Sequence, residues 1–295
     1  MGQYHVEKYA ALPEVDLIGV YDVDPSRRDE IALRHQTRSF RRLNDLLREV
    51  AAVSVAAPTT AHYEITAACL EQGVDVLVEK PITDSSATAK ALVDLADKMG
   101  RLLQVGHIER FNPAFQTLLP HLESPFFFEA YRWSQWPKRN LDVDVIFDLM
   151  IHDIDLALQL FPEKKVSHIE ALGSSLSGSG VDAAEARVRF ADNSHALFSV
   201  SRLSHRAERL LRVHQDKGIF HVDLLSQRIV CSSPGEPLKE IPLQETPEKD
   251  ALSRELSAFA SASLSRTSPL VSAADGLRAI GLAEQIRNAM MLAGV

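Results

Sequence analysis

Short apolar segments alternate with amphipathic helices over the first 105 residues, and this alternation constrains the fold more than any other feature of the chain. Each predicted strand is apolar on both faces, which is typical of a parallel sheet covered by helices on both sides. The predicted strands are 17–21, 51–57, 74–78 and 102–105, and the predicted helices are 3–12, 26–35, 42–48, 61–71 and 84–99. The pattern predicts a doubly wound α/β domain, whose ligands bind beyond the carboxyl ends of the strands.

After about residue 110 the alternation stops. Strand-like stretches then follow one another with few helices between them, which indicates one large, mostly antiparallel, open sheet in an α+β domain. The predicted strands are 126–133, 166–174, 183–191, 195–203, 208–214, 219–224 and 228–231, and the predicted helices are 145–160, 249–264 and 272–291. We therefore expect two domains, 1–109 and 110–295, as the length of 295 residues also suggests.

The composition excludes several classes of protein. Lys and Arg number 32 against 40 Asp and Glu, so the formal net charge is 32 − 40 = −8, which argues against a nucleic-acid partner. The apolar runs fall short of the ~20 residues that a membrane helix needs. Two cysteines are too few for a disulfide framework, and the first residues lack the pattern of a signal peptide. We expect a cytoplasmic protein with no membrane association.

Four polar residues form a stripe on the apolar helix predicted over 145–160 and just before it. Asp144, Asp148, His152 and Asp155 recur at positions i, i+4, i+8 and i+11, so they share one face. Buried carboxylates and imidazoles are costly unless they are paired or line a cavity, so we expect the stripe to face a pocket. There Asp148 would orient His152 as a general acid or base. A satisfied core network is the alternative; a metal site lacks a second nearby histidine, and we expect none.

Glu79, Lys80 and Pro81 follow the predicted strand 74–78 at the ligand-binding edge of the first domain. The proline restricts Lys80 to an extended conformation, which helps to fix the direction of its side chain. A lysine held at this edge can move a proton or donate to a substrate oxygen. The alternative is an ordinary loop lysine after a strand.

Taken together, four motifs resemble the glucose–fructose oxidoreductase/inositol dehydrogenase family, often written Gfo/Idh/MocA. They are residues 1–5 (MGQYH), 79–81 (EKP), 106–113 (GHIERFNP) and the set Asp148, His152 and Asp155. The resemblance implies an N-terminal NAD(P)-binding Rossmann domain and reversible oxidation of a sugar or cyclitol hydroxyl. It also implies a homodimer or homotetramer formed through the open C-terminal sheet. Residues 110–113 (RFNP) and 148–155 (DLMIHDID) look most like the UDP-N-acetylglucosamine 3-dehydrogenase branch.

The same resemblance assigns roles to individual residues. Lys80 and His152 match the catalytic lysine and histidine, and Asp148 matches the acidic partner of the histidine. Asp22 matches an acidic residue that binds the adenosine ribose, which favours NAD, although Asp22 could instead begin a turn and the nearby Arg27 leaves NADP as an alternative. The residues assigned to cofactor binding are Gly2, Asp22, Pro58, Thr59, His62, Glu79 and Lys80. For His62, the start of a helix is an equal alternative.

Basic and polar residues beside the proposed pocket suit a nucleotide-sugar diphosphate, because arginine binds phosphate oxygens in a fork. These residues are Arg110, Asn112, Arg132, Lys138 and Arg139. A solvated basic edge is the alternative.

Only the final glycine of the G-x-G-x-x-G fingerprint is present, as Gly2. By comparison with the family, the first strand and two glycines are missing. We expect a start codon assigned too far downstream or a truncated chain, with weak NAD binding, less cooperative folding and a groove beside residues 17–21. A natural loss of cofactor binding is the alternative. Such a loss would make the protein a non-catalytic sugar-nucleotide sensor or scaffold. Two other functions are also candidates. One is a cyclitol or free-sugar dehydrogenase, and the other is an enzyme that transfers electrons between two sugars through tightly held NADP.

Overall fold

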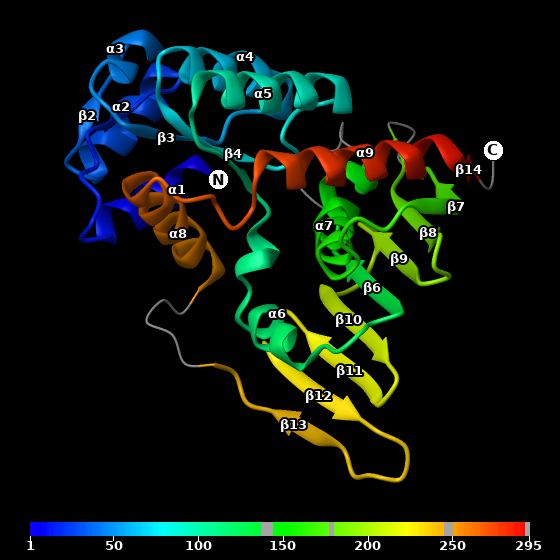
Figure 1. Cartoon of the computed structure of the whole chain (residues 1–295). Coiled ribbons are helices and arrows are strands. Elements are labelled where there is room, and N and C mark those ends of the chain that lie inside the picture. Colours follow the sequence, from blue (N-terminus) through cyan, green and yellow to red (C-terminus); the bar gives the residue numbers. More distant parts are fainter. Residues whose placement is uncertain (137–143, 177–179, 245–249, 293–295) are drawn as a thin grey trace. The chain divides into compact units, whose positions relative to one another are not determined.

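The computed structural model divides the chain into two compact units (Figure 1). The residues that it describes are 1–136, 144–176, 180–244 and 250–292. Unit 1 comprises Met1–His107 and Glu248–Leu277, and unit 2 comprises Ile108–Pro247 and Arg278–Val295.

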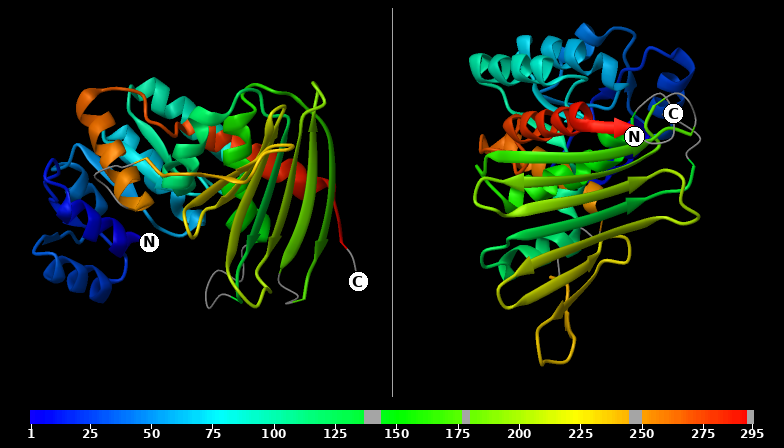
Figure 2. Two further views of the ribbon diagram at one scale, coloured as in Figure 1. Left: turned by 90° about the horizontal axis from the view of Figure 1, so that it is seen from below. Right: turned by 90° about the vertical axis from the view of Figure 1, so that its right-hand side faces the viewer.

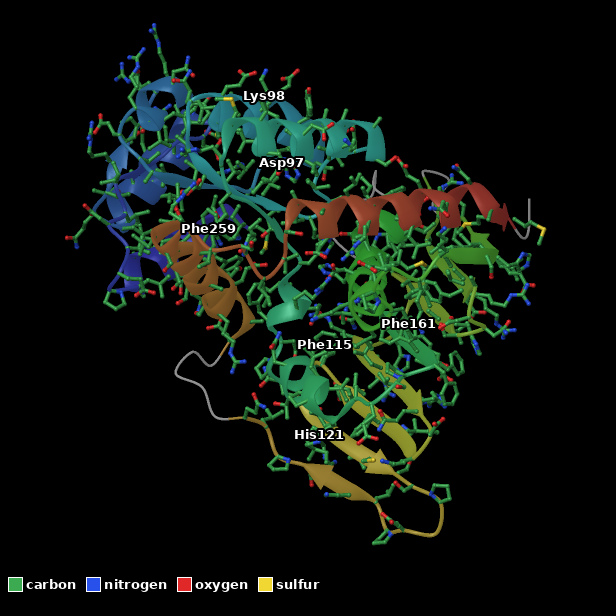
Figure 3. All side chains as sticks on the ribbon, viewed as in Figure 1. Asp97, Lys98, Phe115, His121, Phe161 and Phe259 are labelled. Atoms are coloured by element: carbon green, nitrogen blue, oxygen red, sulfur yellow. The ribbon has the colours of Figure 1, made fainter. Side chains whose placement is uncertain are left out.

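The predicted domains, 1–109 and 110–295, differ from these units because a late segment of the chain joins unit 1. Helix α8 (Ala251–Ser265) supplies the physical reason. Its Leu256 and Phe259 pack against Leu77 in a buried core of unit 1. Phe259 is labelled on α8 in Figure 3. Burial of these apolar side chains holds α8 in unit 1, although α8 follows most of unit 2 in the sequence.

The described part of unit 1 contains five parallel strands, of which the sequence predicted four and missed the two-residue β2, and they form two separate sheets. One sheet pairs β1 with β2, and the other has the order β3-β4-β5. The strands are β1 (Gly19–Val20), β2 (Arg38–Ser39), β3 (Ala52–Val55), β4 (Asp75–Glu79) and β5 (Leu103–Gly106). Within the described residues β1 and β3 have no ladder between them, so each presents an open edge. All five residues of β4 are buried, which places the end of this strand firmly in the core.

The helices of unit 1 begin and end at recognisable residues. Asp24 caps α2 by accepting from the amides of Ser26 and Arg27, and Ser85 caps α5 by accepting from Thr88. Helix α5 ends at Gly100, whose φ of 59° is the left-handed conformation that glycine adopts easily. The remaining bounds are α1 (Gly2–Ala11), α2 (Pro25–Arg34), α3 (Leu43–Leu47), α4 (Thr59–Glu71) and α5 (Ser86–Met99).

Unit 2 is built on a nine-stranded sheet with the order β13-β12-β11-β10-β6-β9-β8-β7-β14. The pairs β6–β9 and β14–β7 are parallel and the other six are antiparallel, which confirms the mostly antiparallel sheet. The strands are β6 (Phe127–Trp133), β7 (Val166–Ser174), β8 (Ala183–Phe190), β9 (His195–Ser201), β10 (Glu208–Gln215), β11 (Gly218–Asp223), β12 (Arg228–Ser232), β13 (Lys239–Ile241) and β14 (Met290–Leu292). The sequence did not predict the two edge strands β13 and β14.

Helices lie on one face of this sheet, and no helix in the described part of unit 2 covers the other face (Figure 2). They are a 3-10 turn (Ile108–Phe111), α6 (Pro113–Leu118), a second 3-10 turn (Leu119–His121), a π-helical turn (Ile146–Met150), α7 (Ile151–Leu160) and the later part of α9 (Ala273–Ala289). Alternation along β8 buries every second residue, from Ala184 to Phe190, against the helices. No helix among the described residues is long and apolar enough to cross a membrane.

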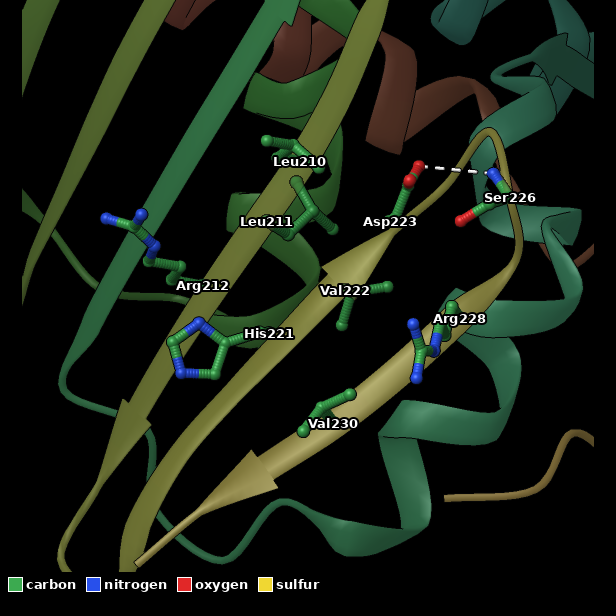
Figure 4. Close-up of a pocket in the computed structure, with 9 residues that line it drawn as sticks. All are labelled: Leu210, Leu211, Arg212, His221, Val222, Asp223, Ser226, Arg228 and Val230. Atoms are coloured by element: carbon green, nitrogen blue, oxygen red, sulfur yellow. Dashed lines mark hydrogen bonds between the residues drawn. The ribbon is translucent and has the colours of Figure 1, made fainter. Parts of the chain in front are cut away.

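A pocket lies on the uncovered face, over β10, β11 and β12 (Figure 4). Leu210, Arg212, His221 and Val230 point to this face from the three strands. Their neighbours Leu211 and Val222 are buried on the helical side. The uncovered face therefore mixes apolar and charged side chains.

Candidate active site

Lys80 follows the carboxyl end of β4, where the sequence predicts the ligand-binding edge of unit 1. The preceding residue, Glu79, is buried, and the Lys80–Pro81 peptide bond is cis. Pro58 follows the neighbouring strand β3 and precedes α4. Because β3 and β4 are parallel, the loops that contain Pro58 and Lys80 leave the sheet at the same edge.

Asp22 lies just after β1 and is partly exposed. One carboxylate oxygen accepts from the amide of Asp24 at 2.9 Å, so Asp22 does begin a turn. The other oxygen lies 3.7 Å from a guanidinium nitrogen of Arg27. The turn fixes the carboxylate just after β1, and the role of Asp22 in binding the adenosine ribose stays a prediction.

A buried polar network that the sequence analysis missed adjoins Lys80. The Nε2 atom of His5 on α1 lies 2.9 Å from the Oε1 atom of Glu79, and its Nδ1 atom lies 3.0 Å from the hydroxyl of Ser54. The hydroxyl of Tyr9 lies 3.1 Å from the same Ser54 oxygen. The only sequence signal for this network was the position of His5, three residues after Gly2 in the first motif.

The carboxyl group of Glu255 on α8 is fully buried in unit 1, and within the described residues neither of its oxygens has a hydrogen-bond partner. Burial, with a further contribution from the charge of Glu79, raises the pKa of Glu255 well above its ordinary value. The raised pKa favours the protonated, neutral form of Glu255. A lone buried carboxylate would otherwise carry a large desolvation cost.

His62 lies in the first turn of α4, as the alternative interpretation of this residue supposed, and its ring is buried. Its Nδ1 atom lies 2.8 Å from the carbonyl oxygen of Pro81, and its Nε2 atom lies 2.9 Å from that of Ala57. The two ring nitrogens therefore contact the backbone after β4, at Pro81, and the backbone after β3, at Ala57. The assignment of His62 to cofactor binding stays a prediction.

Unit 2 holds the predicted catalytic pair at the junction of two kinds of helix. Asp148 lies in the π-helical turn and His152 in the first turn of α7, and both side chains are partly exposed. Single π-helical turns within helices are frequently found at functional sites. Asp144 at the start of the stripe accepts from the amide of Ile146 and pairs with Arg287 at 2.8 Å.

Buried ion pairs surround this junction. Asp155, the last residue of the stripe, binds Arg110 through two contacts of 2.6 and 2.9 Å. Arg132 on β6 donates to both oxygens of Asp153, at 2.7 and 2.9 Å, and to Glu109 at 2.8 Å. The Asp155 end of the stripe is thus held by a salt bridge inside unit 2.

Glu109 links this network to the surface. It accepts from Asn112 at 3.1 Å and from the partly exposed Arg209 at 3.1 Å. Burial opposes its ionisation, but Arg132 and Arg209 together hold the pKa of Glu109 below its ordinary value. Arg209 lies 100 residues from Glu109 and was not predicted from the sequence.

Three of the predicted substrate-binding residues lie in the described part of the chain, and each has a partner within unit 2. Arg110 and Arg132 are bound to carboxylates, and Asn112 caps α6 by accepting from Ala114. Lys138 and Arg139 lie outside the described residues. The substrate-binding role of Arg110, Asn112, Arg132 and Arg139 stays a prediction. The described residues contain no group of three or more His, Cys, Asp or Glu side chains that could hold a metal ion.

Unit 1 has residues that fit a dinucleotide. Helix α1 begins at Gly2, and a helix start attracts a pyrophosphate through its free amides. Asp22 presents a carboxylate at the end of β1. A Cβ atom at Gly2 would lie 3.8 Å from the Cβ atom of Ala56, an ordinary contact, so packing does not by itself require glycine there.

A first unit of parallel strands and helices, followed by an α+β unit with a large mixed sheet, is the architecture of two-domain NAD-binding dehydrogenases. Comparison with known proteins identifies the family. Residues 1–107 match the model "Oxidoreductase family, NAD-binding Rossmann fold" of Gfo/Idh/MocA, and residues 88–221 match the "GFO/IDH/MocA C-terminal domain". The chain belongs to this family and is an NAD-binding oxidoreductase, as the sequence predicted.

Individual relatives support the same result. The chain is 32% identical to a UDP-N-acetylglucosamine 3-dehydrogenase from Acidithiobacillus ferrooxidans, over 98% of this chain and 94% of that protein. A solved structure of that dehydrogenase gives a TM-score of 0.92 at 31% identity, with the same coverage. An inositol 2-dehydrogenase from Rubrobacter xylanophilus is 30% identical over 59% of this chain and 52% of its own length.

Proposed function

We propose that this protein oxidises the C3 hydroxyl of UDP-N-acetylglucosamine in an NAD-dependent reaction. The observation that carries the proposal is the likeness to the Acidithiobacillus ferrooxidans dehydrogenase, which extends over 98% of the chain in both sequence and structure. Lys80, Asp148 and His152, which the family resemblance assigns to catalysis, are all present in the sequence. The likeness to an inositol 2-dehydrogenase makes cyclitol oxidation the second candidate.

Unit 1 would hold the cofactor with the start of α1 at the pyrophosphate, Asp22 at the adenosine ribose, and the loops of Pro58 and Lys80 beyond the strand ends. Bound NAD supplies the hydride acceptor for the reaction. A carboxylate at position 22 disfavours a 2′-phosphate, which supports NAD over NADP.

The proton of the sugar hydroxyl goes to Lys80 or to His152. Asp148 lies one turn before His152 and would hold the imidazole in the tautomer that accepts the proton. Loss of the hydroxyl proton to the protein, and of the hydrogen on C3 as a hydride, would leave a ketone at C3.

Separate Lys80→Ala and His152→Ala variants test this assignment. Loss of a general acid or base lowers turnover by about 10²- to 10⁴-fold, while NAD binding should be retained. NADH formation measures turnover, with UDP-N-acetylglucosamine, UDP-N-acetylgalactosamine, myo-inositol and free glucose as substrates and with NAD and NADP as cofactors. Unchanged turnover in both variants would refute the catalytic assignment. Tight binding of the nucleotide sugar without turnover in the unaltered chain would support the sensor alternative.

We further propose that two or four copies associate in the cytoplasm through the uncovered face of the unit 2 sheet. Half-buried aromatic and aliphatic side chains lie on this face, among them Phe127, Tyr131 and Leu197. The pocket over β10, β11 and β12 lies on the same face (Figure 4). Sedimentation analysis of the chain, compared with a Tyr131→Glu variant, tests the association.

A further inference from the structure

Two buried histidines contact the two residues that flank Lys80. His5 is 2% exposed and contacts the carboxylate of Glu79. His62 is 1% exposed and contacts the carbonyl oxygen of Pro81. The lysine is thus joined on each side to a residue that a histidine holds, and both histidines come from helices of unit 1.

The contacts of His5 have a definite direction. A carboxylate only accepts, so the Nε2 atom of His5 carries the proton that it shares with Glu79. Burial raises the pKa of Tyr9, so its phenol stays protonated and can donate to Ser54. Ser54 can in turn donate to the Nδ1 atom of His5. These hydrogen bonds can form one chain in which each group donates to the next, in the order Tyr9, Ser54, His5 and Glu79. The chain ends on the residue before Lys80.

The contacts of His62 join two loops. Both of its partners are backbone carbonyl oxygens, that of Pro81 at the Nδ1 atom and that of Ala57 at the Nε2 atom. One partner, Pro81, follows Lys80, and the other, Ala57, precedes the loop of Pro58. The imidazole therefore ties the end of β4 to the end of β3.

The carboxylate of Glu79 lies close to Gly106 on the neighbouring strand. Gly106 pairs with Glu79 across β4 and β5, and a Cβ atom there would lie 3.1 Å from the Glu79 Cα atom and 3.2 Å from its Oε2 atom. The absence of a side chain at Gly106 thus makes room for the carboxylate. The fully buried carboxyl of Glu255 on α8 lies near enough to Glu79 for the charge of Glu79 to contribute to its raised pKa.

We propose that His5 and His62 are positioning residues for Lys80. His5 fixes Glu79 through its Nε2 atom, His62 fixes Pro81 through its Nδ1 atom, and together they set the direction of the lysine side chain. The inference rests on the proposed function only for the chemistry that Lys80 performs. A displacement of a catalytic group by about 1 Å can lower the rate about 10²-fold, so the position of Lys80 should affect turnover strongly.

Amide side chains offer a crossed test, because asparagine places its nitrogen near the position of Nδ1 and glutamine near that of Nε2. His5→Gln keeps a donor toward Glu79, and His62→Asn keeps a donor toward the carbonyl oxygen of Pro81. His5→Asn and His62→Gln lose that donor. Thr66→Val is a matched control on α4, because it removes a fully buried hydroxyl that has no hydrogen-bond partner within the described residues.

The first measurement needs no substrate. The whole chain is acetylated with trace acetic anhydride across a pH series, and the labelling of Lys80 is compared with that of the exposed Lys90 by mass spectrometry. Only the neutral amine reacts, so the ratio reports the environment and direction of Lys80. We expect the ratio to change about threefold or more in His5→Asn and His62→Gln, and to stay within about twofold in the other variants.

The second measurement is steady-state turnover of UDP-N-acetylglucosamine. His5→Asn and His62→Gln should lower kcat about tenfold with KM nearly unchanged, and His5→Gln should restore most of the rate. Equal labelling ratios in the two variants of each histidine, with the fold retained by circular dichroism, would overturn the proposal. Altered labelling in a chain that turns over no sugar nucleotide would support the positioning role while refuting the proposed substrate.

Discussion

The buried ionisable groups of unit 2 are paired with one another, whereas unit 1 buries a carboxyl group that has no partner among the described residues. In unit 2, Arg132 binds Asp153 and Glu109, and Arg110 binds Asp155. In unit 1, His5 binds Glu79, whereas the fully buried carboxyl of Glu255 has no hydrogen-bond partner among the described residues, and its raised pKa favours the neutral form. The two units therefore reduce the desolvation cost of a buried charge in different ways. Unit 2 pairs its buried charges, whereas the raised pKa of Glu255 in unit 1 favours its neutral form.

The difference indicates where each unit is vulnerable. A paired network fails when one partner is removed, because the remaining charge stays in a medium of low dielectric. A protonated carboxyl fails when the pH rises, because the unfolded chain releases the proton more easily than the folded one. Mutation should therefore affect unit 2 most, and alkaline pH should affect unit 1.

The largest effect is expected for Arg132→Met. The variant leaves Asp153 and much of Glu109 uncompensated in the core, which should destabilise unit 2 by about 3–5 kcal/mol. Both tryptophans of the sequence, Trp133 and Trp136, lie in unit 2, so their fluorescence during urea unfolding reports this unit.

The matched control is Arg228→Met. Arg228 pairs with Glu240 at 2.8 Å, a distance like that between Arg132 and Glu109, but both side chains are more than half exposed. Its loss should cost less than about 1 kcal/mol. If the two variants unfold at the same urea concentration, the pairing of buried charges is not what stabilises unit 2.

A Glu255→Gln variant should have a smaller, pH-dependent effect on unit 1. The pKa of Glu255 is raised in the folded chain, so its stabilising contribution is complete below about pH 4.3 and falls as the pH rises above that value. The loss has a slope of up to about 1.4 kcal/mol per pH unit, and the neutral amide should abolish it. Amide hydrogen exchange in β4, compared between pH 5 and pH 8, measures the slope. A variant with the slope of the unaltered protein would contradict protonation of Glu255.

Much of this architecture could be predicted from periodicity. The strand predicted over 166–174 matches β7 at both ends, and Lys80 lies directly after β4 as the Glu-Lys-Pro motif indicated. Hydrophobic patterning identifies the face that an element buries, but it does not identify the partner of that face. The sequence therefore did not reveal that α8 returns to unit 1.

Side-chain partners were harder to predict for the same reason. His5 and Glu79 are separated by 74 residues, and nothing local links an imidazole at one position to a carboxylate at the other. Arg132 was predicted to bind a ligand because an arginine near a pocket suits phosphate. A guanidinium suits a carboxylate equally well, and the fold supplies Asp153 and Glu109.

The smallest effect is expected for Arg209→Gln, at the exposed end of the unit 2 network. Arg209 is nearly half exposed, and Glu109 keeps Arg132 in the variant, so the loss near neutral pH should be about 0.5–1 kcal/mol and should shrink in salt. The pKa of Glu109 is lowered in the folded chain, so its contribution is present above about pH 4.3 and disappears as the pH falls through the folded value.

Without Arg209 the pKa of Glu109 should rise, so acid unfolding of unit 2 should begin at a higher pH. Tryptophan fluorescence during acid titration measures this midpoint. Arg212→Gln is the matched control, because Arg212 lies on the same strand, is similarly exposed and pairs with Glu129 at the same distance of 3.1 Å. An acid midpoint that moves equally in both variants would mean that Arg209 acts as a general surface charge. A shift confined to Arg209→Gln would show that the paired network of unit 2 extends to solvent through this one arginine.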